Sequence, residues 1–211
     1  MYVPGHFSID ERGREALAEE VASGELVTWG EAGLLATHVP VLFDPSLGSQ
    51  GGFLGHLARN NDQWRHPVTG DALLICTGPN GYVSPGWYPS KADGGRVVPT
   101  WNYLTVHAYG QIEFFDDVAR LEAIVTGLTV RHEGQRAQPW AVSDAPRDYL
   151  DGMLRAIVGF SLTLTRFEAK AKLSQNRPDG DIAGVIDGVQ ADGNEPLADL
   201  MRTWNPKVSG T

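Results

Sequence analysis

One segment of the sequence combines an imidazole and a guanidinium in a pattern suited to phosphate. Gly55-His-Leu-Ala-Arg-Asn-Asn61 follows a predicted strand directly. If the chain turns helical here, His56 and Arg59 share one face because they are three residues apart. Free amides at a helix start, an imidazole and a guanidinium together form an anion pocket, with Asn61 at its border. A surface helix start with a solvated arginine remains the alternative.

A second candidate lies in the strand-like segment Thr37-His-Val-Pro-Val-Leu-Phe43. Neighbouring residues of a strand point to opposite faces, so one of Thr37 and His38 is presented to a ligand if the other face is core. A histidine satisfied at a strand edge is the equally weighted structural interpretation.

Aromatic residues are concentrated between residues 82 and 109. Alternation along the strand that begins at Thr100 places five side chains on one face: Trp101, Tyr103, Thr105, His107 and Tyr109. Such rings form either an aromatic core layer or a wall against which a planar ligand packs, and both interpretations stay open.

Polar residues fill the segment Lys172-Leu-Ser-Gln-Asn-Arg177. It is either an ordinary polar loop or a loop that closes over an anionic or polar ligand, with Lys172 and Gln175 as candidate contacts.

Several reaction classes lack their motifs. No phosphate-binding loop of the Gly-x-x-x-x-Gly-Lys-Ser/Thr type is present, and Ser84 has the wrong surroundings for a nucleophile elbow. The six histidines form no zinc-hydrolase pattern, so no metal site is predicted.

The composition is typical of a cytoplasmic globular protein without direct nucleic-acid or membrane partners. The net charge of −9 disfavours phosphate backbones, and the sequence contains no basic stripe. Cys76, the single cysteine, lies in an apolar run and is predicted to be buried. No leader pattern and no apolar stretch long enough to cross a bilayer are seen.

The periodicity predicts an α+β fold built on a barrel, as one domain over residues 1–211 with a helical extension from about residue 179. We expect strands at 25–29, 34–43, 52–56, 72–77, 100–109 and 159–167, with 111–115 as the hairpin partner of 100–109. Residues 78–98 are predicted to be a loop. Helices are expected at 9–22, after a cap at Asp116 or Asp117, and at 146–157.

Seven landmarks along the chain match one family in order. They are Met1-Tyr-Val-Pro4, His38-Val-Pro40, Gly55-His-Leu-Ala-Arg59, Ser84-Pro-Gly-Trp-Tyr88, Val98-Pro-Thr-Trp-Asn-Tyr103, Ala156-Ile-Val-Gly159 and Lys172-Leu-Ser-Gln-Asn-Arg177. With them the chain resembles the PaiB-type proteins, known as FMN-binding negative transcriptional regulators.

The resemblance implies an FMN-binding split β-barrel with flanking helices, in which two subunits form a homodimer and the small-molecule cofactor lies between them. It implies that the phosphate is held after an early strand and that residues 172–177 close the site, from the partner subunit in one arrangement. The candidate cofactor-binding residues are Thr37, His38, His56, Arg59, Asn61, Trp101, Lys172 and Gln175.

Three functions remain open. The first is an FMN-dependent redox protein or sensor with an indirect effect on transcription, in which His107 and Tyr103 face the substrate. The second is a haem-binding enzyme similar to piperazate synthase or to haem-degrading split-barrel proteins, with His38, His56 or His107 as axial ligand. The third is a DNA-binding repressor, against which the negative charge stands.

Overall fold

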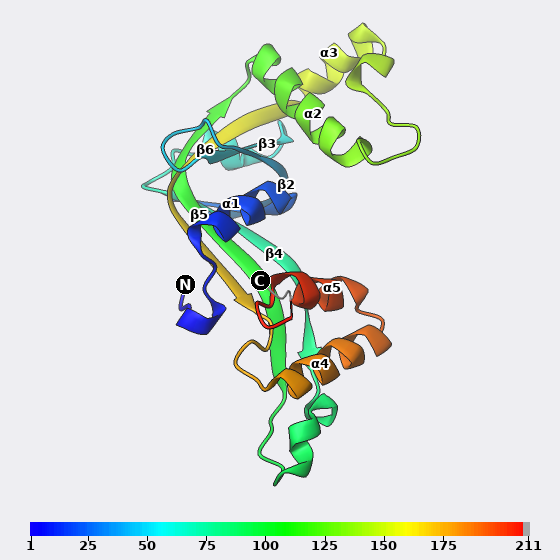
Figure 1. Cartoon of the computed structure of the whole chain (residues 1–211). Coiled ribbons are helices and arrows are strands. Elements are labelled where there is room, and N and C mark those ends of the chain that lie inside the picture. Colours follow the sequence, from blue (N-terminus) through cyan, green and yellow to red (C-terminus); the bar gives the residue numbers. More distant parts are fainter. Residues whose placement is uncertain (209–211) are drawn as a thin grey trace. The chain divides into compact units, whose positions relative to one another are not determined.

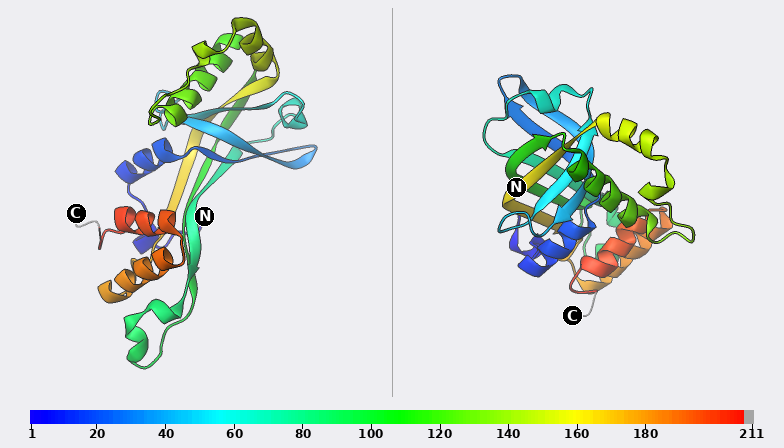
Figure 2. Two further views of the ribbon diagram at one scale, coloured as in Figure 1. Left: turned by 90° about the vertical axis from the view of Figure 1, so that its right-hand side faces the viewer. Right: turned by 90° about the horizontal axis from the view of Figure 1, so that it is seen from above.

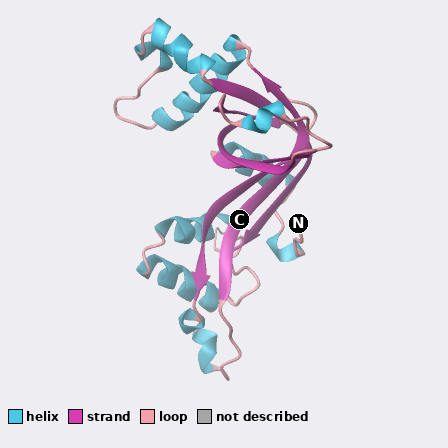
Figure 3. Ribbon diagram, turned by 180° about the vertical axis from the view of Figure 1, so that it is seen from behind, coloured by secondary structure: helices cyan, strands magenta, loops and turns pink. Residues whose placement is uncertain are grey.

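Six antiparallel strands form the framework of the protein. The computed structural model describes residues 1–208, and for residues 11, 12 and 15 it describes the backbone only. The strands close into a barrel in the order β1-β2-β3-β6-β5-β4, and helices flank them (Figures 1 and 3). Their bounds are β1 Ser23–Gly30, β2 Gly33–Asp44, β3 Gly52–Ala58, β4 Ala72–Val83, β5 Thr100–Phe115 and β6 Ile157–Lys172. The predicted α+β split barrel is confirmed.

The contacts divide the chain into two compact units. We call Glu15–Cys76 with His107–Phe167 the central unit. Met1–Arg14, Thr77–Val106 and the residues from Glu168 onward form the terminal unit. The strands β4, β5 and β6 contribute residues to both units. The expectation of one domain over residues 1–211 stays a prediction, and its last three residues lie outside the described part.

The core of the central unit comes from alternating strand residues. Val41 on β2 and Phe53 on β3 are fully buried, as are Phe160 and Leu162 on β6. Gly55 pairs with Phe160, and a Cβ at Gly55 would meet the Phe160 ring at 2.6 Å. The register therefore requires glycine at this position so that the phenylalanine ring can fill the barrel.

Two helices of the central unit pack against each other. Helix α2 (Val118–Glu133) begins at Asp117, whose carboxylate accepts a hydrogen bond from the Arg120 amide at 2.8 Å, as predicted for this cap. Helix α3 (Arg147–Arg155) adds Leu150 and Leu154 to an apolar cluster with Leu121. The green and yellow ribbons of Figure 2 show this pair.

In the terminal unit, α4 (Asp179–Ala191) and α5 (Glu195–Trp204) lie side by side (Figure 2). The indole of Trp87 packs on α4 where a Cβ at Gly188 would come within 2.3 Å of the ring. Asp181 on α4 fixes the short 3-10 turn Pro89–Ala92, because its carboxylate accepts hydrogen bonds from the Ser90 amide and hydroxyl at 3.0 and 2.7 Å. The first helix of the chain, α1 (Glu11–Glu20), precedes the barrel strands.

Three sequence-based predictions of the fold were wrong. The predicted loop over residues 78–98 begins as strand, because β4 runs on to Val83 before two short 3-10 turns. The predicted hairpin between 100–109 and 111–115 is one strand, β5. Gly110 marks a close approach there and makes no turn, since its Cβ position lies 2.0 Å from the Thr163 carbonyl oxygen. Strand β6 continues past residue 167 to Lys172.

The predicted burial of Cys76 is confirmed. Cys76 is buried at 4% exposure, and burial raises the pKa of its thiol to about 12. No helix within residues 1–208 is long and apolar enough to span a bilayer.

Candidate functional site

A polar network in the central unit joins two of the predicted cofactor-binding residues. The Asn61 side-chain amide donates to the Thr37 hydroxyl at 2.8 Å, and that hydroxyl donates to Oε1 of Gln63 at 2.5 Å. The nitrogen of the buried Gln63 side chain reaches the Thr28 hydroxyl and the Leu26 carbonyl, both at 3.0 Å. The network therefore presents Thr37 and Asn61 as one fixed polar pair.

His38 lies on the opposite face of β2, as the alternation predicts. It is exposed, and its Nδ1 lies 2.8 Å from a carboxylate oxygen of Glu25 on β1, the residue paired with it across the two strands. It is thus a surface histidine next to an acid.

His56 and Arg59 do not share a helical face, so that prediction was wrong. Strand β3 continues to Ala58 because its residues pair with β6, with His56 opposite Gly159. Nδ1 of His56 is buried and has no hydrogen-bond partner among the described residues. Burial lowers the pKa of the imidazole, which keeps the ring neutral near pH 7.

Arg59 has a structural role in the central unit. Its Nε donates to the Arg155 carbonyl at 2.7 Å and Nη2 to the Ile157 carbonyl at 3.1 Å, where α3 gives way to β6. Nη1 lies 3.6 Å from the Asp116 carboxylate. Of the five N–H groups of a guanidinium, two are used by carbonyls, so donors remain for an anion.

The outward face of β5 carries the predicted row of side chains. Burial alternates along the strand, with Trp101, Tyr103 and His107 on the more exposed face. In the terminal unit, Trp101 is half exposed, and its indole nitrogen donates to Oδ1 of Asn80 at 3.1 Å. In the central unit, the rings of His107 and Tyr109 lie edge to face with centroids 6.4 Å apart.

Lys172 lies beside Trp101 in the terminal unit. Its ammonium donates to the Trp101 carbonyl at 2.6 Å and to the Thr100 hydroxyl. Burial lowers the pKa of Lys172, and the positive charges of Lys170 and Arg177 lower it further. A cation repelled by two other cations is stabilised by an anion.

The loop after Lys172 is fixed by hydrogen bonds to strands β6 and β5. The side chain of the buried Gln175 donates to the Ala171 carbonyl at the end of β6 at 2.6 Å and accepts from the Leu173 amide at 2.7 Å. Ser174 has φ of +66° and a hydroxyl that receives a hydrogen bond from the buried Asn102 amide at 3.0 Å. Gln175 therefore shapes the loop that carries Lys172.

Sequence reasoning missed Gln63 and Asn102. Asn102 had a signal, because an asparagine on the buried face of an alternating strand needs a partner. Gln63 had none, since it lies in the short 3-10 helix Asp62–Arg65, where no periodicity marks a buried side chain.

The predicted site residues divide between the two units. Thr37, His38, His56, Arg59, Asn61 and His107 belong to the central unit. Trp101, Tyr103, Lys172 and Gln175 belong to the terminal unit. Within their units the structure brings together Thr37 with Asn61 and Trp101 with Lys172, while His38 points away from Thr37. Their contact with a cofactor stays a prediction.

Comparison with known proteins identifies the family. Residues 1–166 match the family model described as "Putative FMN-binding domain". The chain belongs to this FMN-binding family. FMN is the cofactor that the match assigns, as the sequence predicted.

Relatives of known sequence and structure agree. The "Protease synthase and sporulation protein PAI 2" of Bacillus subtilis is 31% identical, over 95% of this chain and 96% of its own length, which confirms the PaiB resemblance. A conserved hypothetical protein of Mycobacterium tuberculosis has a TM-score of 0.54 at 11% identity, covering 84% of this chain and 94% of its own. The "FAD and Heme binding protein" of Mycobacterium smegmatis has a TM-score of 0.51 at 16% identity, with coverages of 83% and 78%. At these identities the two structures show a shared fold.

Proposed function

We propose that this chain is an FMN-dependent redox protein or sensor that works as a homodimer in the cytoplasm, and that any effect on transcription is indirect. The observation that carries the proposal is the position of Lys172, a partly buried cation that two further cations destabilise, bonded to the backbone carbonyl of the half-exposed Trp101. An anionic ligand with a flat ring system suits such a pair.

The side chains present fit FMN. Lys172 supplies a positive charge, Trp101 a stacking surface, and Arg59 with Asn61 supplies N–H donors for a phosphate. The first two belong to the terminal unit and the last two to the central unit, and each pair is proposed on its own surroundings. When bound, FMN supplies electron transfer, and the protein supplies position and charge.

Roles for the other predicted residues follow from their surroundings. Thr37 holds the Asn61 amide in place through the network around Gln63. Gln175 keeps Lys172 at the start of a rigid loop. His107 and Tyr103 share the outward face of β5 and are our candidates for contact with the substrate.

The visible spectrum of the purified protein, with release of the chromophore on denaturation, tests the proposal. We expect a two-band flavin spectrum and FMN in the supernatant. Lys172→Gln and Arg59→Gln should each weaken FMN binding roughly tenfold, whereas Lys91→Gln, an exposed lysine of the terminal unit, should leave it unchanged. Equal binding by all three variants would overturn this site, and a colourless protein that takes up no FMN would overturn the cofactor. Sedimentation velocity checks the dimer.

Haem is the second candidate, supported by the buried, unpartnered Nδ1 of His56, which burial keeps neutral as an iron ligand requires. A Soret band lost in His56→Ala, and kept in His38→Ala and His107→Ala, would establish it. A pure flavin spectrum would exclude haem as the bound cofactor.

A DNA-binding repressor ranks third because the net charge is −9. A gel shift at physiological salt with promoter DNA should show no specific complex; a specific one would reverse this ranking.

A further inference from the structure

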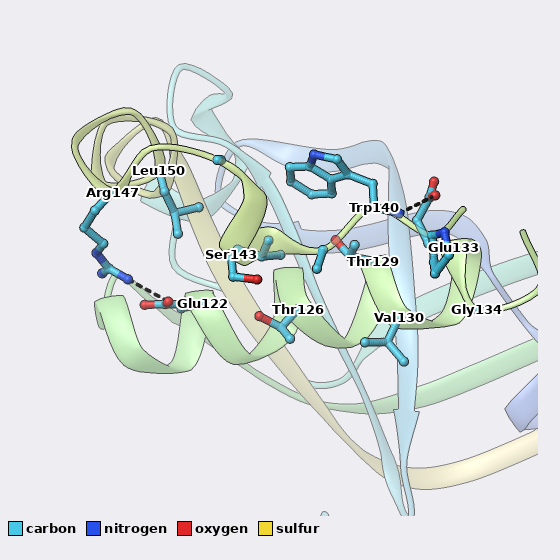
Figure 4. Close-up of a pocket in the computed structure, with 14 residues that line it drawn as sticks. Glu122, Thr126, Thr129, Val130, Glu133, Gly134, Trp140, Ser143, Arg147 and Leu150 are labelled. Carbon is cyan, nitrogen blue, oxygen red and sulfur yellow. Dashed lines mark hydrogen bonds and ion pairs between the residues drawn. The ribbon is translucent and has the colours of Figure 1, made fainter. Parts of the chain in front are cut away.

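A pocket of about 660 Å³ opens between helix α2 and the chain that returns over it at residues 139–147 (Figure 4). The volume is in the range of small-molecule sites. All its lining residues lie between Glu122 and Leu150, within the central unit. None of the residues predicted to hold the cofactor lines it, so the flavin proposal leaves this pocket without a role.

One wall of the pocket is an indole. Trp140 is 47% exposed, and Figure 4 shows its ring across from the side of α2 that carries Thr126 and Thr129. The buried side chains of Val142 and Leu150 form the apolar base of the pocket. Leaving so much of an indole in water is costly, and a flat ring stacked on it removes that cost.

The backbone that carries the ring is held in place before any ligand arrives. The backbone amide of Trp140 donates to Oε2 of Glu133, at the last turn of α2, at 3.1 Å (Figure 4). Pro139 precedes it and restricts the backbone. The wall therefore needs little ordering on binding.

The three charged residues that line the pocket already have partners. At one end Arg147 donates to Glu122 at 2.7 Å (Figure 4) and also pairs with Asp151. At the other end Glu133 pairs with Arg136 at 3.1 Å. Three carboxylates face only two guanidiniums among these groups, so the ends of the pocket carry a net charge of −1 and disfavour an anionic ligand.

Polar groups remain between these ends. Within residues 1–208, the hydroxyls of Thr126 and Ser143 make no hydrogen bond to another residue, whereas the Thr129 hydroxyl is used by the Val125 carbonyl. The two free hydroxyls can bond a carbonyl or ring nitrogen of a ligand.

From these contacts we infer a second ligand site, independent of the cofactor, that binds a neutral, flat aromatic molecule carrying a hydrogen-bond acceptor. The molecule stacks on Trp140 over Val142 and Leu150, and Thr126 or Ser143 donates to its acceptor. Anions are disfavoured because the charged groups at the two ends sum to −1.

The neutral naphthalene ketone prodan is a suitable probe, because its emission shifts to the blue in apolar surroundings. Titrated into the full-length protein, it should bind saturably with one site per chain, with the same affinity in the presence and absence of saturating FMN. An anionic analogue that carries a sulfonate in place of the ketone should bind roughly tenfold more weakly.

Variants locate the site. Trp140→Ala should weaken prodan roughly tenfold through loss of stacking, and Thr126→Phe, an exposed position on α2, should block the pocket. Trp29→Ala is the matched control because Trp29 is also in the central unit and is 53% exposed. Equal losses at Trp140 and Trp29, competition by FMN, or full affinity in Thr126→Phe would overturn the inference. Circular dichroism verifies the fold of each variant.

Discussion

The side-chain amide of Asn61 lies 2.8 Å from the hydroxyl of Thr37, and the same hydroxyl lies 2.5 Å from the Gln63 side chain. Gln63 thus fixes the Thr37 hydroxyl, which in turn holds Asn61, the residue proposed to meet a phosphate. A donor that is preorganised in this way loses little freedom on binding an anion.

Gln63 should be a main determinant of stability. We expect Gln63→Ala to lower the free energy of unfolding by roughly 2 to 4 kcal/mol, because it leaves the Thr28 hydroxyl and the Leu26 carbonyl without their partner in a buried place. Urea unfolding measures the loss, and the exposed Gln138→Ala is the control. Similar midpoints for the two variants would contradict the structural role of the network.

His56 should make the protein less stable in mild acid. Its folded pKa is below the ordinary value of 6.5, so as the pH falls below 6.5 the unfolded chain takes up a proton before the folded chain does. Stability is then lost between 6.5 and the lowered pKa. Unfolding free energies at pH 7.5 and pH 5.5 should differ less in His56→Phe than in the original chain. The exposed His66→Phe serves as the comparison, and an unaltered pH dependence in His56→Phe would speak against this assignment.

Two glycines of α4 should respond in opposite ways to alanine. A Cβ at Gly188 would meet the Trp87 ring at 2.3 Å, whereas a Cβ at Gly180 meets nothing within 4 Å. Gly188→Ala should therefore cost roughly 1 to 3 kcal/mol, while Gly180→Ala should be neutral or stabilise by up to about 1 kcal/mol. Thermal melts of both variants check this contrast. A stable Gly188→Ala protein would show that Trp87 is free to move.

Cys76 should be inert in the folded protein. With a pKa of about 12, its thiol is almost wholly protonated at pH 8. Ellman's reagent should leave the native protein unmodified and should titrate one thiol per chain in urea. Rapid modification without urea would mean that the barrel opens around Cys76.

Much of the fold could be predicted because its signals are local. The outward row on β5 follows from a period of two, and the start of α2 follows from a carboxylate ahead of helical spacing. In both cases neighbours in the sequence decide the structure.

The wrong predictions concern pairings between distant residues. The spacing of His56 and Arg59 predicts the start of a helix. The segment is instead the extended strand β3, because residues about 100 positions later in the sequence pair with it. The sequence predicts a turn at Gly110, but in the structure the glycine is needed because the Thr163 carbonyl lies where a Cβ would be. The candidate site follows the same rule, since Thr37 and Asn61 could be predicted from the sequence but their buried partner Gln63 could not.

The continuity of β6 from Ile157 to Lys172 has a practical consequence for anyone shortening this gene product. A truncation at residue 166, where the family match ends, would cut through a strand. It would also delete the partners of Asn102, Trp87 and Ser90, leaving buried amide and indole groups uncovered. Such a fragment should be recovered in inclusion bodies, and soluble expression requires the chain to extend at least through α5, to Trp204.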